Sequence, residues 1–244
     1  MDKLYIVIPA YNESENIGQV VKEWYPIVEK YNGDGESRLV IIDDGSSDNT
    51  YEIICELAKK RSLLYPVTKP NAGHGATVLY GYRYAMENGA DYIFQTDSDG
   101  QTRPEEFHQF WENRKKYSAV IGYRNHREDG ISRIIVTKTL KLVLRLIFGL
   151  NVTDANTPFR LMRREILEEY LQDIPKDFNL SNVMLTVLLL YNKEKVAFIP
   201  ITFRPRQGGV NSINLPKITK IGIRAVKDFR IIKKGLKRHE RNSF

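Results

Sequence analysis

The chain has 244 residues, 42% of them hydrophobic, which is enough to bury one sizeable core, and we expect a single domain. Its one cysteine, Cys55, excludes both a disulfide framework and a cysteine-ligated metal site. The formal net charge is +7, yet the stretch from Lys217 to Arg241 alone carries +8 (ten basic and two acidic residues), which leaves −1 for the rest. Basic charge confined to one end argues against nucleic acid as a partner, because a nucleic-acid-binding core carries its basic face in the folded domain.

The sequence also carries no sign of export or of a membrane span. Met1-Asp2-Lys3 leads directly into a predicted strand, so we expect no signal peptide. No apolar run reaches the roughly 18 residues that a spanning helix needs. We therefore expect a protein on the cytoplasmic side of the membrane.

The first half of the chain alternates predicted strands and helices. Apolar runs bounded by turn residues predict strands at Leu4–Ile8, Leu39–Ile42 and Leu63–Val67, and a fourth beginning at Tyr92. Apolar residues at helical spacing predict helices at about Glu15–Lys30, around Ile53–Ala58, and from the Asn71–Gly75 turn to Ala85. This alternation predicts an α/β fold with a mostly parallel central sheet and helices on both faces. Right-handed crossovers bring the loops that follow the strands to one edge, where ligands bind in such sheets.

The loop after the fourth strand, Asp97-Ser98-Asp99-Gly100-Gln101, is the strongest candidate for a site. Asp97 and Asp99 are two positions apart, so in an extended segment their side chains point the same way and converge. Two close carboxylates repel each other unless a cation lies between them, and a hard divalent cation fits best. Gln101 offers a neutral oxygen to the same point. The alternative is a solvated acidic turn, which an isolated Asp-x-Asp usually is.

The three earlier strand ends also carry polar clusters. Their members are Tyr11 and Glu13, then Asp43 and Asp44, then Asn71, Gly73 and Gly75. Each has a structural alternative, since carboxylates can cap helices and glycines can form turns. Four clusters at four successive strand ends favour a binding site.

These clusters, in this order, resemble the family 2 inverting glycosyltransferases, which have the nucleotide-diphosphosugar-binding GT-A fold. The matching stretches are Pro9-Ala10-Tyr11-Asn12-Glu13, Asp43–Thr50, Asn71-x-Gly73-x-Gly75 and Asp97–Gln101. No Gly-x-Gly-x-x-Gly follows the first strand, which weighs against a dinucleotide-binding domain. Gln101 extends the resemblance to the dolichyl-phosphate mannosyltransferase-like branch, which carries Asp-x-Asp-x-Gln and transfers sugars to polyprenyl phosphate.

The resemblance implies a division of the chain and a set of site residues. The GT-A domain would span 1–214, with a nucleotide-sugar and metal half (1–125) and an acceptor half (126–214), followed by a basic amphipathic helix and tail (215–244). A GDP- or UDP-sugar would be bound by Pro9, Tyr11, Glu13, Asp43, Asp44, Asn71, Gly75, Asp97, Ser98 and Arg206, with Asp43 or Asp44 on the base. Mg²⁺ or Mn²⁺ would be held by Asp97, Asp99 and Gln101, and the acceptor phosphate by Arg124, Arg133 and Ser212. The residues implied in catalysis are Asp99, Arg124, Asp154 and Arg206.

The second half is interpreted as the acceptor half. A strand is predicted at Ala119–Gly122, and Val152–Glu165 resembles the branch's Asp-x-x-Ser-Gly-Phe-Arg segment, with the stiffer Thr157-Pro158 in place of Ser-Gly. No carboxylate pair precedes the apolar helix that begins near Phe178–Asn182. A sugar hydroxyl needs a base, whereas a phosphate acceptor is already an anion, so the missing pair favours a phosphate. Asp154 or Asp177 remains a possible base.

Two further features of this half concern the phosphates and the membrane. After a predicted strand at Phe198–Phe203, Arg204–Ser212 resembles the branch's mobile loop, with Arg206 on the diphosphate; the alternative is an ordinary connection. Ser132–Phe148 and the stretch from Ile218 to Leu236 are predicted basic amphipathic helices. They predict attachment to an anionic membrane surface, although each could instead pack on the domain with a solvated basic face.

Together these features predict metal-dependent, inverting transfer of a hexose from a nucleoside-diphosphate sugar to polyprenyl phosphate. The enzyme would be peripheral on the inner face of the membrane, and any membrane-embedded partner would be a separate chain. One alternative is a family 2 transferase that extends a cell-surface polysaccharide or lipid-linked saccharide through a sugar hydroxyl. A more remote one is a non-catalytic membrane-surface binding module.

Overall fold

A computed structural model describes residues 2–33, 35–124, 131–204, 226–230, 232 and 233, with 131–136 described as helix only. Seven strands form one sheet in the order β3-β2-β1-β4-β6-β5-β7. They are β1 (Leu4–Ala10), β2 (Arg38–Asp43), β3 (Leu64–Thr68), β4 (Tyr92–Gln95), β5 (Ala119–Arg124), β6 (Arg160–Arg163) and β7 (Val196–Ile201). Adjacent strands pair in parallel except that β6 is antiparallel to both β4 and β5. The predicted mostly parallel α/β sheet is confirmed.

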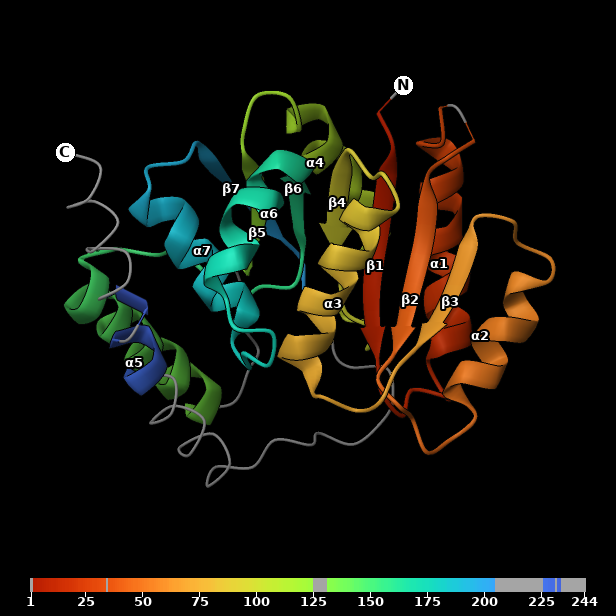
Figure 1. The fold of residues 1–244 in the computed structure, drawn as a ribbon, viewed down its shortest axis with the longest axis horizontal. Helices are drawn as coiled ribbons and strands as arrows, with labels where there is room; N and C mark the ends of the chain where they lie inside the picture. The colour runs from red at the N-terminus through yellow and green to blue at the C-terminus, as the bar shows by residue number, and fades with distance from the viewer. Residues whose placement is uncertain (1, 34, 125–130, 205–225, 231, 234–244) are drawn as a thin grey trace.

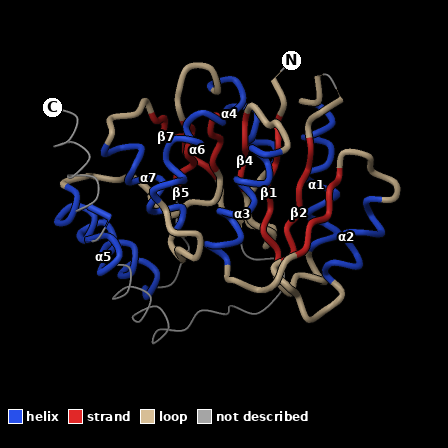
Figure 2. The backbone as a smooth tube through the Cα atoms, in the orientation of Figure 1, coloured by secondary structure: helices blue, strands red, loops and turns tan. Residues whose placement is uncertain are grey.

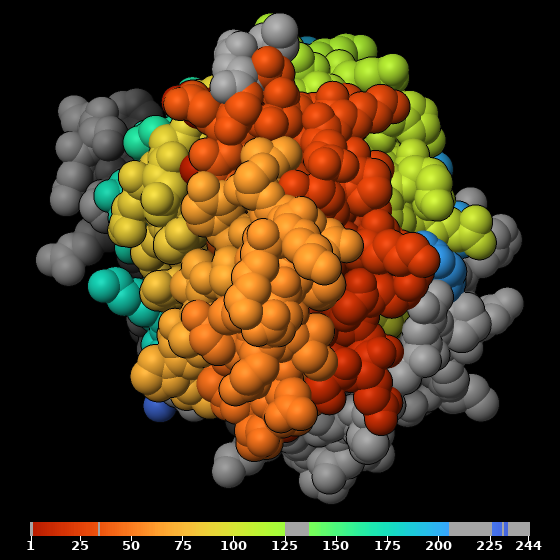
Figure 3. Space-filling view, turned by 90° about the vertical axis from the view of Figure 1, so that its right-hand side faces the viewer, coloured from red at the N-terminus to blue at the C-terminus, as the bar shows by residue number. Residues whose placement is uncertain are grey.

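Helices cover both faces of the sheet (Figures 1 and 2). They are α1 (Ile17–Lys30), α2 (Thr50–Ala58), α3 (His74–Glu87), α4 (Phe107–Asn113), α5 (Ile131–Phe148), α6 (Arg164–Tyr170) and α7 (Ser181–Tyr191), with 3-10 turns η1 (Pro104–Glu106) and η2 (Leu171–Asp173). Residues of α1, α2 and α4 share one core with the sheet, and those of α3, α5, α6 and α7 share the other. Figure 3 views the end of the molecule formed by the first part of the chain, beyond β3.

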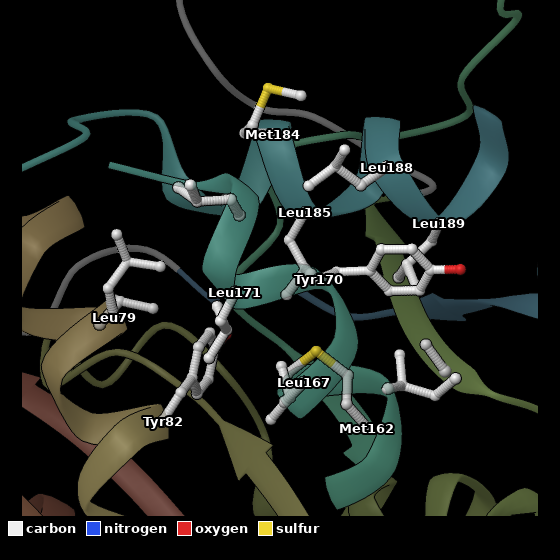
Figure 4. Close-up of a cluster of buried hydrophobic side chains, with 14 of the residues drawn as sticks. Leu79, Tyr82, Met162, Leu167, Tyr170, Leu171, Met184, Leu185, Leu188 and Leu189 are labelled. Carbon is white, nitrogen blue, oxygen red and sulfur yellow. The ribbon is translucent and has the colours of Figure 1, made fainter. Parts of the chain in front are cut away.

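The alternation of side chains along β1 assigns its residues to these two cores. Leu4, Ile6 and Ile8 pack with the α1 side, while Tyr5 and Val7 pack with the α3 side. Every residue of β1 is buried, as expected for a central strand covered on both faces. The second core is dominated by leucines of α7 and by residues of α3 and α6 (Figure 4).

Strand β6 is not among the strands predicted from the sequence. Its four residues, Arg160–Arg163, begin and end with arginine and so lack the apolar signature of a buried strand. Arg160 is nevertheless fully buried. The neighbouring strands β4 and β5, rather than local propensity, hold this segment in the sheet.

The described part of the basic stretch near the C-terminus packs on the domain. Phe229, which the amphipathic pattern assigns to a membrane-facing stripe, is fully buried. Its ring centroid lies 6.0 Å from that of Phe148 and 6.1 Å from that of Phe178. Burial in the second core therefore explains this apolar position. Among the described residues, no helix combines the length and apolarity required to span a bilayer.

Candidate active site at the carboxyl edge of the sheet

The loops that follow β1 and β2 are bound to each other at the carboxyl edge of the sheet, at the bottom of Figure 1. The Asn12 backbone N–H donates to Ser46 Oγ at 2.9 Å, and the Ser47 N–H donates to Asn12 Oδ1 at 2.8 Å. One step further, the Ser14 N–H donates to Asp48 Oδ2 at 3.1 Å. Burial acts to raise the pKa of Asp48, but hydrogen bonds from Thr50 and Ser14 outweigh it and hold that pKa below its usual value.

Three predicted donor-binding residues, in β1 and in the loop after it, differ in what they can offer a ligand. Pro9 lies inside β1 and is buried. Glu13 is also buried, and its carboxylate accepts a hydrogen bond from Asn16 Nδ2 at 2.7 Å. Tyr11 is 49% exposed, so its ring is available to a ligand at this edge.

The two adjacent acidic residues at the end of β2 bind the end of β3 and the loop that follows it. Asp44 is buried, pairs with Lys69, and accepts hydrogen bonds from the Ala72 and Gly73 N–H groups, each at 2.9 Å. The Asp43 carboxylate accepts from the Thr68 hydroxyl at 2.9 Å. Asp44 thus fixes the start of α3 and Asp43 joins the ends of β2 and β3, so both carboxylates have a structural role whether or not they also contact a base.

Glycine is required where that same loop meets the chain before α7. A Cβ on Gly75 would lie 2.3 Å from the Phe178 carbonyl oxygen and 2.4 Å from that of Asn179. Asn71 contributes differently, since its exposed side chain donates to the Asp44 carbonyl at 2.9 Å. Gly75, predicted as a donor-binding residue, thus allows close packing of α3 against backbone.

Asp97 lies beside the start of α3. Its Oδ1 is 3.7 Å from His74 Nε2, and this oxygen is buried without a hydrogen-bond partner among the described residues. The predicted convergence of Asp97 and Asp99 assumes an extended segment, but β4 ends at Gln95 and the backbone bends over 98–100. Ser98 is buried in this bend. The bend, rather than strand alternation, positions the two carboxylates.

The other two predicted metal ligands are linked to each other and to the chain after β7. The Gln101 N–H donates to Asp99 Oδ1 at 3.1 Å. The Gln101 side chain donates through Nε2 to the Arg204 carbonyl at 3.1 Å. The described residues contain no group of three His, Cys, Asp or Glu side chains arranged as a metal site. The predicted ligand set is two carboxylates and one amide oxygen, which suits Mg²⁺ or Mn²⁺.

Two of the predicted catalytic residues, Arg124 and Asp154, form an ion pair. Arg124 donates from Nε to Asp154 Oδ2 at 2.9 Å and from Nη2 to Oδ1 at 3.1 Å. Asp154 also accepts from the Asn156 N–H and the Thr157 hydroxyl, both at 3.3 Å. The guanidinium of Arg124 lies 5.2 Å from the ring centroid of Phe203. Asp154 is therefore fully engaged as an acceptor.

The buried guanidinium of Arg160 supports the loop that carries Asp154. Arg160 donates to the carbonyls of Ala155, Thr157 and Asn182. Burial lowers its pKa, with nearby Tyr82, Asp154 and Asp97 acting in the opposite direction. These bonds tie the loop that carries Asp154 to the start of α7.

Several predicted residues lie beyond what the structure describes. Arg206 and Ser212 are outside the described residues, and the side chain of Arg133 in α5 is not described. Asp177, the other possible base, is exposed in the turn before α7. The sequence analysis assigned no role to His74, Lys69 or Arg160, although Arg160 is the arginine of the segment that resembles Asp-x-x-Ser-Gly-Phe-Arg. For His74 a signal existed, namely its position inside the Asn71–Gly75 motif at a predicted helix start.

A mostly parallel sheet covered by helices, with carboxylates on the loops at the ends of its parallel strands, is the architecture of a GT-A nucleotide-sugar transferase. The family described as "Glycosyl transferase family 2" matches residues 5–171. The chain belongs to this family of glycosyltransferases.

Several similar proteins have names that refer to a phosphorylated polyprenol, undecaprenol or dolichol. The chain is 27% identical over 220 residues to a polyprenol monophosphomannose synthase of Mycolicibacterium smegmatis, covering 86% of this chain and 80% of that protein. It is 30% identical over 190 residues to a UDP-N-acetylglucosamine–dolichyl-phosphate N-acetylglucosaminyltransferase of Methanococcus voltae, covering 68% and 72%. It spans about half the length (50%) of an undecaprenyl-phosphate 4-deoxy-4-formamido-L-arabinose transferase of Pectobacterium atrosepticum, with 26% identity.

Among solved structures, glucosyl-3-phosphoglycerate synthase of Mycobacterium tuberculosis in complex with UDP is similar, with a TM-score of 0.67 and 19% identity. The match covers 96% of this chain and 80% of that one. The same enzyme has been crystallised with Mn²⁺, UDP and glucosyl-3-phosphoglycerate, and that structure gives a TM-score of 0.66. These similarities confirm the predicted fold.

Proposed function

We propose that the protein is an inverting, metal-dependent glycosyltransferase that moves a hexose from a UDP- or GDP-sugar to polyprenyl phosphate at the cytoplasmic face of the membrane. The names of the relatives from Mycolicibacterium smegmatis and Methanococcus voltae support a lipid-phosphate acceptor. The observation that carries the choice of acceptor is the state of Asp154. Its carboxylate is bound by Arg124, Asn156 and Thr157, so it is a poor base for a sugar hydroxyl. A phosphate acceptor needs no such base.

The residues at the end of β4 fit a divalent cation. The buried Asp97 Oδ1 has no hydrogen-bond partner among the described residues, and leaving a carboxylate oxygen buried in this way is costly unless a ligand completes it. Asp97, Asp99 and the amide oxygen of Gln101 would hold Mg²⁺ or Mn²⁺. When bound, such an ion neutralises the charge that develops on a leaving diphosphate.

The chain's own residues would then bind and orient the two substrates. Tyr11 offers an exposed ring face to the nucleoside at the sheet edge. Asp43 joins the ends of β2 and β3, and Asp44 holds the loop that begins α3 and with it His74 beside Asp97. The ion pair with Asp154 orients the guanidinium of Arg124 for an incoming phosphate.

A transfer assay tests the proposed acceptor. With one radiolabelled nucleotide sugar at a time and Mn²⁺ present, we expect label to enter polyprenyl phosphate and not a saccharide acceptor. Label in the saccharide alone would instead support the hydroxyl-extending alternative. Absence of transfer from every UDP- and GDP-sugar to either acceptor would favour a binding module.

We further propose that α5 attaches the enzyme to an anionic membrane surface. Leu142 and Leu146, one turn apart, are 56% and 75% exposed. Lys138, Lys141 and Arg145 are exposed on the same helix. Exposed leucines among cations form the kind of surface that enters the headgroup region of anionic bilayers.

Replacing both leucines with Asp should reduce binding to phosphatidylglycerol vesicles by roughly tenfold or more, because each inserted leucine contributes roughly 1 kcal/mol or more. Co-sedimentation measures this directly. The control is Tyr80→Asp, which changes an exposed aromatic residue on a different helix, α3. This variant should bind as the unaltered protein does. Equal binding by the double variant and the control would rule out this surface.

A further inference from the structure

Gln101 binds both the backbone N–H and the backbone carbonyl of Arg204, a residue far away in the sequence. Its backbone carbonyl accepts a hydrogen bond from the Arg204 N–H at 2.8 Å, and its side-chain Nε2 donates to the Arg204 carbonyl at 3.1 Å. A carbonyl oxygen is an acceptor only, so the group that faces it must be the NH₂ end of the amide. This contact fixes which way the Gln101 amide points.

The whole segment Thr202–Arg204 is bound to the turn that follows the acidic pair. The Thr202 N–H donates to both carboxylate oxygens of Glu106 at 3.0 Å. Arg204 Nη2 donates to the Thr102 carbonyl at 3.1 Å and pairs with Glu23 at 3.3 Å. Gln101 therefore belongs to a set of contacts that joins the chain after β4 to the chain after β7.

We infer that Gln101 is a positioning residue with two partners: its amide nitrogen holds the segment Thr202–Arg204, and its amide oxygen is thereby kept for the cation. The second half of this inference rests on the proposed function. Among the described residues, the amide oxygen accepts no hydrogen bond. A planar amide donates from one end while it accepts at the other, which a carboxylate cannot do. This explains why an amide, rather than a third acid, follows Asp97 and Asp99.

One consequence is a coupling between the cation site and the chain after β7. A cation that binds the amide oxygen restrains the Gln101 side chain, and the restrained side chain holds the Arg204 carbonyl more firmly. By linkage, loosening the segment should weaken cation binding by the same factor.

The first test is hydrogen exchange of the Arg204 amide, followed by NMR on the protein without ligands. In Gln101→Glu the side chain no longer donates to the Arg204 carbonyl and repels it, while the Arg204 N–H keeps its hydrogen bond to the Gln101 backbone carbonyl. Opening the segment then breaks one hydrogen bond fewer, so exchange of the Arg204 N–H should become about tenfold faster. Gln109→Glu, which adds the same charge on the exposed face of α4, should leave it unchanged. Unchanged exchange in the Gln101 variant would overturn the inference. Should that variant unfold, Gln101→Met removes the donor without adding charge and is judged by the same criterion.

The second test uses Mg²⁺ with inorganic pyrophosphate, whose binding is measured by calorimetry. Binding should slow exchange at Arg204 in the unaltered protein and not in Gln101→Met. Equal slowing in both would overturn the role of the amide oxygen. Absence of binding in the unaltered protein would count against the proposed function and against that same role, while the first test would still decide the anchoring role.

Discussion

Asp99→Asn is expected to lower the rate of metal-dependent sugar transfer by about 10³-fold, or roughly 4 kcal/mol in the activation free energy. The substitution removes a negative charge from the pair that would hold the cation. It keeps an oxygen that can still accept the Gln101 N–H, so the bend over 98–100 should persist. Transfer of radiolabelled hexose at saturating Mn²⁺ measures the effect.

The comparison needs a variant with the same change of charge elsewhere. Asp173→Asn, at an exposed position of η2, should transfer hexose at the unaltered rate. Circular dichroism and the thermal midpoint should agree among all three proteins. Full activity of Asp99→Asn in the presence of EDTA would eliminate the proposed cation site.

Gly75→Ala should destabilise the fold by roughly 2–3 kcal/mol, the cost of forcing a methyl group into a closely packed site. The added Cβ would lie 2.3 Å from the Phe178 carbonyl oxygen, which is a backbone atom and cannot rotate away. Because a chain of this size shifts by about 2–4 °C per kcal/mol, the thermal midpoint should fall by roughly 5–10 °C.

Gly18→Ala is the matched control, since nothing lies within 4 Å of a Cβ built at that position in α1. Its midpoint should be unchanged or slightly higher, because alanine favours helix over glycine. A midpoint for Gly75→Ala within about 1 °C of the control, far less than the expected shift, would show that α3 and the 178–179 turn separate easily. The packing role of this glycine would then be wrong.

The order of the elements could be predicted from the sequence because its signals are local. Every residue of β1 is buried, and the run Leu4–Ile8 marks that strand without reference to any other part of the chain. Strand β6 could not be predicted in this way. Its arginine Arg160 is buried only because carbonyls of residues 155, 157 and 182 surround the guanidinium, and those partners meet only in the folded chain.

The sequence predicted the edge of the sheet at which the polar loops meet, while the roles of the individual residues stay predictions. Polar clusters after four strands meet at one edge, as the handedness of the crossovers requires. The sequence does not distinguish a carboxylate that faces a ligand from one that holds a loop. Asp44 binds Lys69 and the start of α3, whereas the Oδ1 atom of Asp97, in a similar motif, is buried near His74 without a hydrogen-bond partner among the described residues.

By itself, the sequence determined the fold class, the family and the edge at which the polar loops gather, since apolar runs and turn residues act over a few positions. The tertiary structure decided which polar groups are engaged in holding the fold. Asp154 is paired with Arg124, and Gly75 is packed on the backbone of residues 178 and 179. Gln101 is bound to Arg204, which lies 103 positions away in the sequence. A hydrogen bond or a steric contact between distant residues exists only once the chain has folded, and no local pattern encodes it.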